Sequence, residues 1–178
     1  MPLPAPVTPL LTLLYQMGKT IERVDDHVYA APAPGRTSGG VGGHVRHCLD
    51  HVSALLSATR TGVCEYDRRR RNTAVETSRG AACTRIAELT SALVCLDALV
   101  LDDPVLVESQ LEPGGAMILT RSSVCRELAF VISHTIHHNA IVGQILQSHG
   151  VAVDSRYGVA PSTPDAADRR GEPAACAR

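Results

Sequence analysis

The 178-residue sequence has no tryptophan, a single phenylalanine (Phe130) and only four tyrosines, so aromatic side chains cannot form most of a core. Its hydrophobic share of 44% comes mainly from Leu, Val, Ala and Ile. An aliphatic, Ala-rich composition of this kind favours helices that pack against one another. We therefore expect an all-α fold. A single domain is expected, because the chain is too short for two ordinary ones.

An excess of charge of either sign is also absent. Seventeen Lys and Arg residues balance 18 Asp and Glu residues, which leaves a formal net charge of -1 with neutral histidines. Such a balance provides no general attraction to nucleic acid or to an anionic membrane. We therefore expect a small-molecule partner, no nucleic acid and no membrane. Whether two copies associate into a homodimer stays open.

The sequence also shows no C-x-x-C pair, no signal-peptide pattern and no long apolar run. Its N-terminus, Met-Pro-Leu-Pro-Ala-Pro, has no basic start of the signal-peptide kind, and no stretch approaches the roughly 18 apolar residues of a membrane span. None of the six cysteines belongs to a C-x-x-C pair, and four lie in apolar helical stretches where Cys behaves as a small hydrophobe. These patterns predict a cytoplasmic protein in a reducing compartment. The cysteines are Cys48, Cys64, Cys83, Cys95, Cys125 and Cys176.

Four segments carry the apolar periodicity of packed helices. The first helix is expected from Pro9 to about Val28, because apolar residues recur there every three or four positions. The second is expected over about 41–59, before Gly62, and the third over about 78–101, before Asp102-Asp103-Pro104. The fourth is expected from Ser122 or Ser123 to about 149–150. Together they predict a four-helix bundle, which a parallel sheet would contradict.

The segments between and after these helices are expected to be less regular. Residues 63–77 lack an apolar period and are expected to form a connection. Its Arg68 to Arg71 run is most often a solvated face, and the alternative is an anion site at a pocket mouth. Two β-prone runs around a Glu-Pro-Gly-Gly turn, within 105–120, predict a β-hairpin or extended arm before the last helix. We expect a domain over 1–153 and a flexible tail over 154–178.

Histidines are the most informative feature, because six of the eight lie in two helical clusters. On the second helix, His44, His47 and His51 fall within roughly 60° of one another. On the last helix, His134 and His138 lie one turn apart, and His138 interrupts the apolar seam. Although a lone histidine is more often a hydrogen-bonded residue at the core edge, an i, i+4 pair can bind one ion, as in helical zinc sites. The clusters therefore predict a metal site.

His47-x-x-Asp50 on the second helix, together with His134-x-x-x-His138 on the last, resembles the DinB/YfiT-like superfamily of small bacterial metalloproteins. The resemblance covers about residues 8–150 and implies a four-helix bundle. It also implies that His47, His134 and His138 bind a divalent metal ion. Zinc is the first expectation for this ion, and nickel, iron and manganese are the others.

Some residues depart from the pattern of that superfamily. Asn139 follows His138 where relatives frequently carry arginine. His44, His51 and His137 are additional histidines, and any of them could join or replace a predicted ligand. The ligand set is therefore open at these three positions.

Two acidic residues near the predicted site have different expected roles. Asp50, one turn from His47, could accept the N–H of a ligand histidine, and a solvated helix acid is an equal alternative. Glu127 lies about 10 Å below His134 along the helix axis, too far to be a ligand. We expect Glu127 to be a buried partner for an arginine such as Arg46.

The resemblance implies a metal-dependent transferase that uses a low-molecular-weight thiol, because relatives include thiol-dependent transferases and isomerases. No catalytic residue can be assigned. One alternative is a metal-dependent hydrolase with the same ligands. The other is a non-catalytic helical metal-binding protein, which the lack of a general base beside the ligands favours. The Glu-x-x-His pairs of di-iron bundles are absent, as are P-loop, G-x-S-x-G and dinucleotide-binding motifs.

Overall fold

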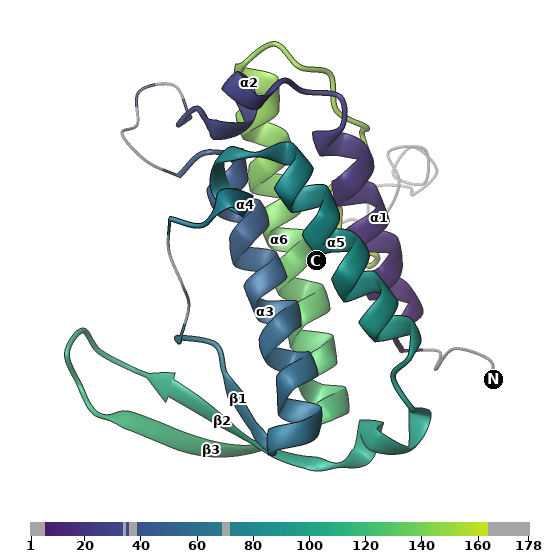
Figure 1. Cartoon of the computed structure of the whole chain (residues 1–178), viewed down its shortest axis with the longest axis vertical. Coiled ribbons are helices and arrows are strands. Elements are labelled where there is room, and N and C mark those ends of the chain that lie inside the picture. Colours follow the sequence, from purple (N-terminus) through teal and green to yellow (C-terminus); the bar gives the residue numbers. More distant parts are fainter. Residues whose placement is uncertain (1–5, 34, 36–38, 69–71, 164–178) are drawn as a thin grey trace, which may run out of the picture.

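The computed structural model describes residues 6–33, 35, 39–68 and 72–163. The fold is mostly helical, with a small three-stranded sheet at one end (Figure 1). Each of two long helices, α1 (Thr8–Ile21) and α3 (Val41–Thr61), packs against both α5 (Arg79–Val94) and α6 (Val124–Ser148). The four helices thus surround one core, and the prediction of a mostly helical protein is confirmed.

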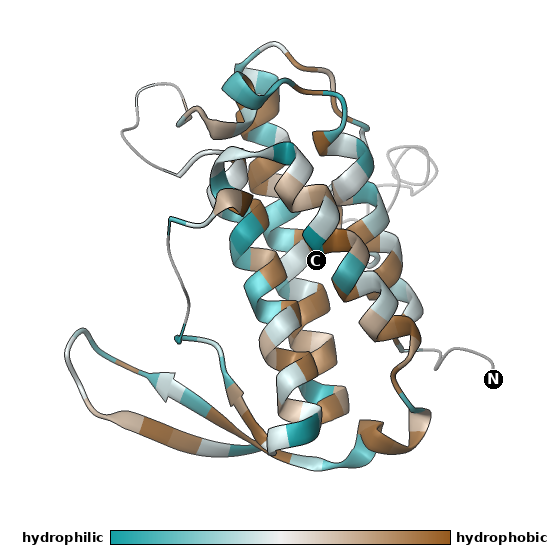
Figure 2. Cartoon of the chain, in the orientation of Figure 1, coloured by the Kyte–Doolittle hydropathy of each residue, from teal (hydrophilic) through white to brown (hydrophobic). Residues whose placement is uncertain are grey.

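The core is aliphatic, as the composition predicts. Each long helix turns an apolar stripe inward, and the hydropathy of its residues alternates along its length (Figure 2). Burial of these stripes stabilises the fold through the apolar area removed from water. Among the largest side chains that are fully or almost fully buried are Leu10, Leu14, Leu49, Leu93 and Leu128.

Two helix ends are where the sequence predicts them. Gly62 follows α3 with a φ of 73°, a left-handed conformation that glycine adopts at low cost, and its N–H donates to Ala58. Ser123 precedes α6, and its hydroxyl accepts the N–H of Arg126. These caps define the two helices that carry the histidine clusters.

The first and third helices are shorter than predicted. The first ends at Ile21 rather than near Val28, because the Asp25 carboxylate accepts the N–H of Val28 and starts a separate helix, α2 (Asp26–Ala30). The third ends at Val94 rather than Leu101, and a 3-10 helix, η1 (Ala98–Asp102), follows. In both places the apolar spacing continues along the sequence, but the helix ends and an aspartate caps the start of a new, short helix.

The hairpin is confirmed, and a strand that was not predicted joins it. β2 (Pro104–Gln110) pairs antiparallel with β3 (Met117–Ser123), while β1 (Val63–Glu65) pairs parallel with β2. The expectation of no parallel pairing was therefore wrong. The three residues of β1 are too few to show the alternating apolar pattern of a strand. The turn at Gly62 places β1 beside β2, and the carbonyl of Gly62 accepts the N–H of Leu106. This sheet lies beyond the helix ends and leaves the helical core intact (Figure 1).

The connection after β1 leads back to the other end of α3. There α4 (Ala74–Thr77) packs against α3, and α5 begins shortly after it (Figure 1). Arg68 pairs with Glu65 at 3.0 Å and with Glu108 at 2.8 Å, so it joins the connection to β2. Arg69 to Arg71 lie outside the described residues.

The chain stays packed beyond α6. The Tyr157 hydroxyl donates to Oδ1 of Asn139 at 3.0 Å, and Gly158 contacts the backbone of Ala140 so closely that a side chain would clash. The packed chain therefore extends at least to Gly158. Most of the predicted tail, residues 164–178, lies outside the described part.

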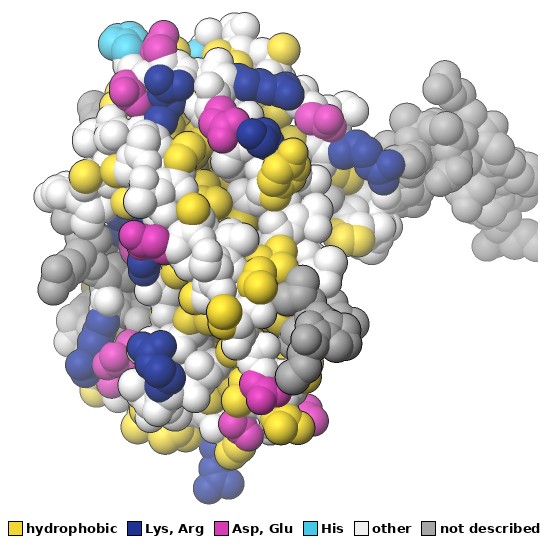
Figure 3. Space-filling model, turned by 45° about the vertical axis from the view of Figure 1, so that its right-hand side comes forward, with side chains coloured by type: hydrophobic (Ala, Val, Ile, Leu, Met, Phe, Trp, Pro, Cys, Tyr) yellow, Lys and Arg dark blue, Asp and Glu magenta, His cyan; other side chains and the backbone are white. Residues whose placement is uncertain are grey.

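The surface carries both signs of charge. On the face shown in Figure 3, basic and acidic side chains are interspersed rather than gathered by sign. Among the described residues, no helix combines the length and the apolar character needed to cross a membrane.

Candidate metal centre

Five imidazole rings meet between α3 and α6. His44, His47 and His51 come from α3, and His134 and His138 come from α6. The centroid of the His47 ring lies 4.8 Å from that of His134 and 4.6 Å from that of His138, and the centroids of His44 and His138 are 5.1 Å apart. The two clusters that the sequence places on separate helices therefore form one site.

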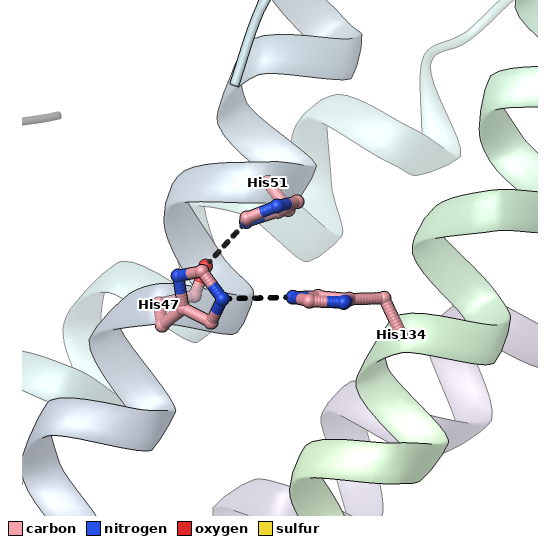
Figure 4. A group of neighbouring side chains, drawn as sticks. All are labelled: His47, His51 and His134. Carbon is pink, nitrogen blue, oxygen red and sulfur yellow. Dashed lines mark hydrogen bonds between the residues drawn. The ribbon is translucent and has the colours of Figure 1, made fainter. Parts of the chain in front are cut away.

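Three of these residues, His47, His51 and His134, lie together: the ring nitrogens of His47 and His134 face each other, and His51 lies beside them with one nitrogen toward the His47 carbonyl (Figure 4). Nε2 of His134 lies 2.9 Å from Nε2 of His47, and the ligand atoms of all three lie within 4.8 Å of one another. Nitrogens that bind one ion at about 2.1 Å can be at most about 4.2 Å apart. A side-chain shift of less than about 1 Å would meet that limit, so the three residues fit a divalent ion.

The contact of His51 with the backbone selects one tautomer of its ring. Its Nδ1 lies 2.9 Å from the backbone oxygen of His47, and a carbonyl oxygen can only accept a hydrogen bond. In the neutral ring the proton is therefore on Nδ1, and the lone pair is on Nε2. Metal-binding histidines commonly donate their second N–H to a backbone carbonyl in this way.

His138, which the sequence predicts as a ligand, lies beside this group of three. Its ring centroid is 4.5 Å from that of His134, and its Nδ1 is 2.9 Å from Nδ1 of His44. Burial, followed by repulsion from His134 and His44, lowers the pKa of His138 to about 3. His138 is therefore neutral near pH 7, as a ligand must be. Its binding to the ion stays a prediction.

His137 is the additional histidine that the structure places away from the others. Its side chain is exposed, and it contacts the cluster only through the ring of His138, at 5.3 Å between centroids. His47, His51 and His134 therefore form the group that can hold an ion, with His44 and His138 next to it.

Two aromatic residues beside the histidines were not predicted. The Tyr66 ring stacks on His51 at 4.8 Å, and the Phe130 ring stacks on His134 at 5.5 Å. Phe130 precedes His134 by four residues, so helical spacing could have found it. Tyr66 follows β1 in the connection, where no period places a side chain.

Glu127 is fully buried next to this aromatic pair. Its carboxylate accepts hydrogen bonds from the hydroxyls of Tyr66 (2.8 Å) and Ser122 (2.6 Å), and pairs with Arg126 at 2.8 Å. The expectation of a buried partner for arginine is met, but the arginine is the neighbouring Arg126. Held by these donors, Glu127 connects the hairpin and the connection to α6.

Arg46, the partner that the sequence suggested for Glu127, pairs with other carboxylates. It lies 2.8 Å from Asp50 and 3.0 Å from Glu76. Arg46 thus joins α3 to Glu76 of α4, and Asp50 holds the same guanidinium from within α3. Whether it also supports a ligand histidine stays a prediction.

Two cavities lie near the candidate centre. One of about 490 Å³ is bordered by the connection, including Val63, Glu65 and Arg68, but no histidine lines it. The other, of about 410 Å³, lies between the hairpin and α6 and is lined by Tyr66 and Phe130. No histidine lines this cavity either, and the rings of Tyr66 and Phe130, which stack on His51 and His134, lie between it and the cluster.

The buried cysteines do not supply a nucleophile at this site. Burial raises the pKa of the Cys48 thiol to about 12 and that of Cys64 to about 11. Both therefore stay protonated near pH 7, and a thiol is a much weaker nucleophile than a thiolate. A thiol that reacts at the candidate centre would have to come from outside the described chain or from an exposed cysteine.

Comparison with known proteins gives a sequence match and a structural match. No protein-family model matches the chain. The chain is 33% identical over 115 residues to a Rhizopus delemar protein named FK506-binding protein 5; the match covers 64% of this chain and 30% of that protein. The chain thus matches less than a third of the length of that relative.

The structural match is to a DinB-like protein from Bacillus subtilis. Its TM-score is 0.64 at 16% sequence identity, over 85% of this chain and 97% of that one. At this identity the likeness concerns the fold, and it agrees with the resemblance that the histidine motifs indicate. The chain therefore has the fold of a DinB-like protein.

Proposed function

We propose that the chain is a divalent-metal-dependent transferase of the four-helix-bundle DinB kind that uses a low-molecular-weight thiol. The observation that carries the metal site is the convergence of His47, His51 and His134 from α3 and α6. The sequence adds His138 as a further ligand, and its ring contacts those of His47 and His134. Zinc, nickel, iron and manganese are the candidate ions.

The ligand residues suit the activation of a thiol. All are neutral imidazoles, so a bound divalent ion would keep its full charge and would lower the pKa of a thiol that contacts it. His51 is held by the His47 carbonyl and needs no change of tautomer to bind. Tyr66 and Phe130 stack on His51 and His134 and so cover one side of the cluster.

The second substrate, which accepts the thiol, has a candidate cavity. The space of about 410 Å³ between the hairpin and α6 is lined by apolar Val107, Leu111, Ile118 and Phe130. A small, partly apolar acceptor fits this lining. Arg126 lines the same cavity 5.6 Å from the Phe130 ring centroid, and its guanidinium pairs there with the Glu127 carboxylate at 2.8 Å.

One feature favours a non-catalytic metal-binding protein as the second candidate. If His51 and His138 both join His47 and His134, four imidazoles surround the ion. Four protein ligands complete a tetrahedral zinc site and leave no position for a substrate, whereas a six-coordinate ion would keep two positions. The number of ligands therefore separates a catalytic from a storage or sensing role.

The metal site is tested by metal content. The protein is purified without a polyhistidine tag, and its metal is measured by elemental mass spectrometry. We expect about one ion per chain in the wild type and in His27→Ala, a control at an exposed position of α2, because the group that can hold an ion among the described residues is the histidine cluster. His47→Ala and His134→Ala should lose it. Full occupancy in either of these variants would contradict the site.

The thiol is tested by calorimetric titration of the metal-loaded protein with a panel of cellular thiols. We expect at least one thiol to bind to the wild type, and none to bind to metal-depleted protein or to His134→Ala. If the wild type binds metal but no thiol, transfer is contradicted. Hydrolysis of ester and amide substrates by the same protein would then support the hydrolase alternative.

A further inference from the structure

His44 makes the second close contact between imidazoles of α3 and α6. Its Nδ1 lies 2.9 Å from Nδ1 of His138, the same separation as between the Nε2 atoms of His47 and His134. Two ring nitrogens at this distance share one proton, so one donates and the other accepts. The contact therefore selects the tautomers of His44 and His138 together.

A second metal ion in place of this proton is opposed by charge. Along the helices, the pair of His44 and His138 lies about 5 Å from the pair of His47 and His134. All five side chains of the cluster are neutral ligands, so none of them would offset the repulsion between two divalent ions this close. A proton shared between His44 and His138 introduces no net charge.

We propose that His44 is a positioning residue, which accepts the Nδ1–H of His138 and so leaves the Nε2 lone pair of His138 free for the metal ion. This inference rests on the metal site of the proposed function and adds the residue that prepares its ligand. His51 shows the same arrangement with a different acceptor, since its Nδ1 donates to the His47 carbonyl. His44 and His51 come from the same face of α3, one on each side of His47.

The proposal explains why this chain carries a histidine one turn before His47. The Nδ1 of His138 lies against an imidazole of the facing helix, whereas the Nδ1 of His51 lies against a carbonyl of its own helix. The His44 imidazole on the facing helix reaches Nδ1 of His138 and has a lone pair that can accept its N–H. His137, the other neighbour of the His138 ring, is exposed and contacts that ring at a tilt of 74°.

The first test measures the binding of Co²⁺, whose visible absorption reports the geometry of its ligands. The affinity is obtained by competition with a chelator for the wild type, His44→Ala, His44→Asn and the control His137→Ala. We expect His44→Ala to weaken binding about 10- to 100-fold, the usual effect of losing such a partner, and to change the cobalt spectrum. His44→Asn should recover most of the affinity, because its amide oxygen can accept. His137→Ala should resemble the wild type.

The second test locates the proton by nitrogen NMR of the imidazoles, in metal-free and zinc-loaded protein. We expect the proton of His138 on Nδ1 in both. A proton on Nε2, or a cobalt affinity and spectrum unchanged in His44→Ala, would overturn this inference and leave the metal site standing. Binding of two cobalt ions by the wild type and one by His44→Ala would also overturn it. Failure of the wild type to bind cobalt would instead remove the proposed function and this inference with it.

Discussion

His51 and His138 illustrate how the surroundings of one side chain decide its chemistry. Both are histidines on the facing stripes of α3 and α6, and both have Nδ1 engaged, one by a carbonyl and the other by an imidazole. His51 belongs to the group whose nitrogens converge, whereas His138 lies beside it with its pKa lowered to about 3. At this scale the ligand role depends on which nitrogen carries the proton.

The lowered pKa of His138 predicts a pH dependence of the metal-free protein. The folded pKa of about 3 lies below the ordinary value of about 6.5, so the unfolded chain takes up the proton more readily. The contribution of His138 to stability is therefore fully present above about pH 6.5 and is lost as the pH falls toward 3. Thermal unfolding with chelator should show a smaller loss over this range in His138→Gln than in the wild type. Parallel curves would contradict the shift.

The start of α3, the helix that carries three histidines, packs closely against α4. Gly42, in the first turn of α3, faces the backbone oxygen of Glu76 and the ring of Tyr29, and has no room for a Cβ. The Tyr29 hydroxyl donates to the backbone of Val75 at 2.7 Å on the same side. Close packing of α2, α3 and α4 therefore fixes the end of α3 nearest His44.

Replacing Gly42 by Ala should destabilise the protein, although alanine normally favours a helix. The added methyl would overlap the Glu76 backbone, at a cost of about 1–3 kcal/mol. Gly43→Ala is the matched control: nothing lies within 4 Å of its Cβ, so we expect a gain of about 0.5–1 kcal/mol. Denaturant unfolding measures both. Equal changes in the free energy of unfolding for the two substitutions would show that α4 does not pack closely against Gly42.

At the scale of the whole molecule, α6 packs on α3 and is held by polar contacts in both its N-terminal and its C-terminal half. The hairpin, the connection and α6 meet at buried Glu127, while Tyr157 and Gly158 pack on the C-terminal half of α6. A metal ion between α3 and α6 would add a further link. Its effect on stability follows from mass action, since the folded chain would bind it and the unfolded chain would not.

Removal of the metal should therefore lower the melting temperature. At a free ion concentration of about 100 times Kd, binding adds about 2.7 kcal/mol, which corresponds to roughly 5–10 °C for a domain of this size. Calorimetry with and without a chelator measures the difference. His134→Ala should show little or no shift, because it lacks a ligand. A wild-type melting temperature that is the same in both conditions would argue against an ion in this cluster.

Much of the fold follows from local patterns in the sequence. Apolar spacing predicts the four long helices, Gly62 and Ser123 mark two of their ends, and the Glu-Pro-Gly-Gly turn marks the hairpin. Each of these signals depends on the conformational preferences of a few neighbouring residues, which the sequence states directly. The early ends at Ile21 and Val94 were missed because apolar spacing continues past the aspartate caps that interrupt the helices.

The histidine site, too, could be predicted from the sequence only in part. Helical spacing alone determined that His47 and His51 share a stripe on one helix and that His134 and His138 share one on another. Only the packing of α3 on α6 decided that His47, His51 and His134 converge, that His138 meets His44, and that Tyr66 covers the cluster. The physical reason is that periodicity fixes the direction of a side chain relative to its own helix, whereas the rotation and height of two facing helices depend on the whole core.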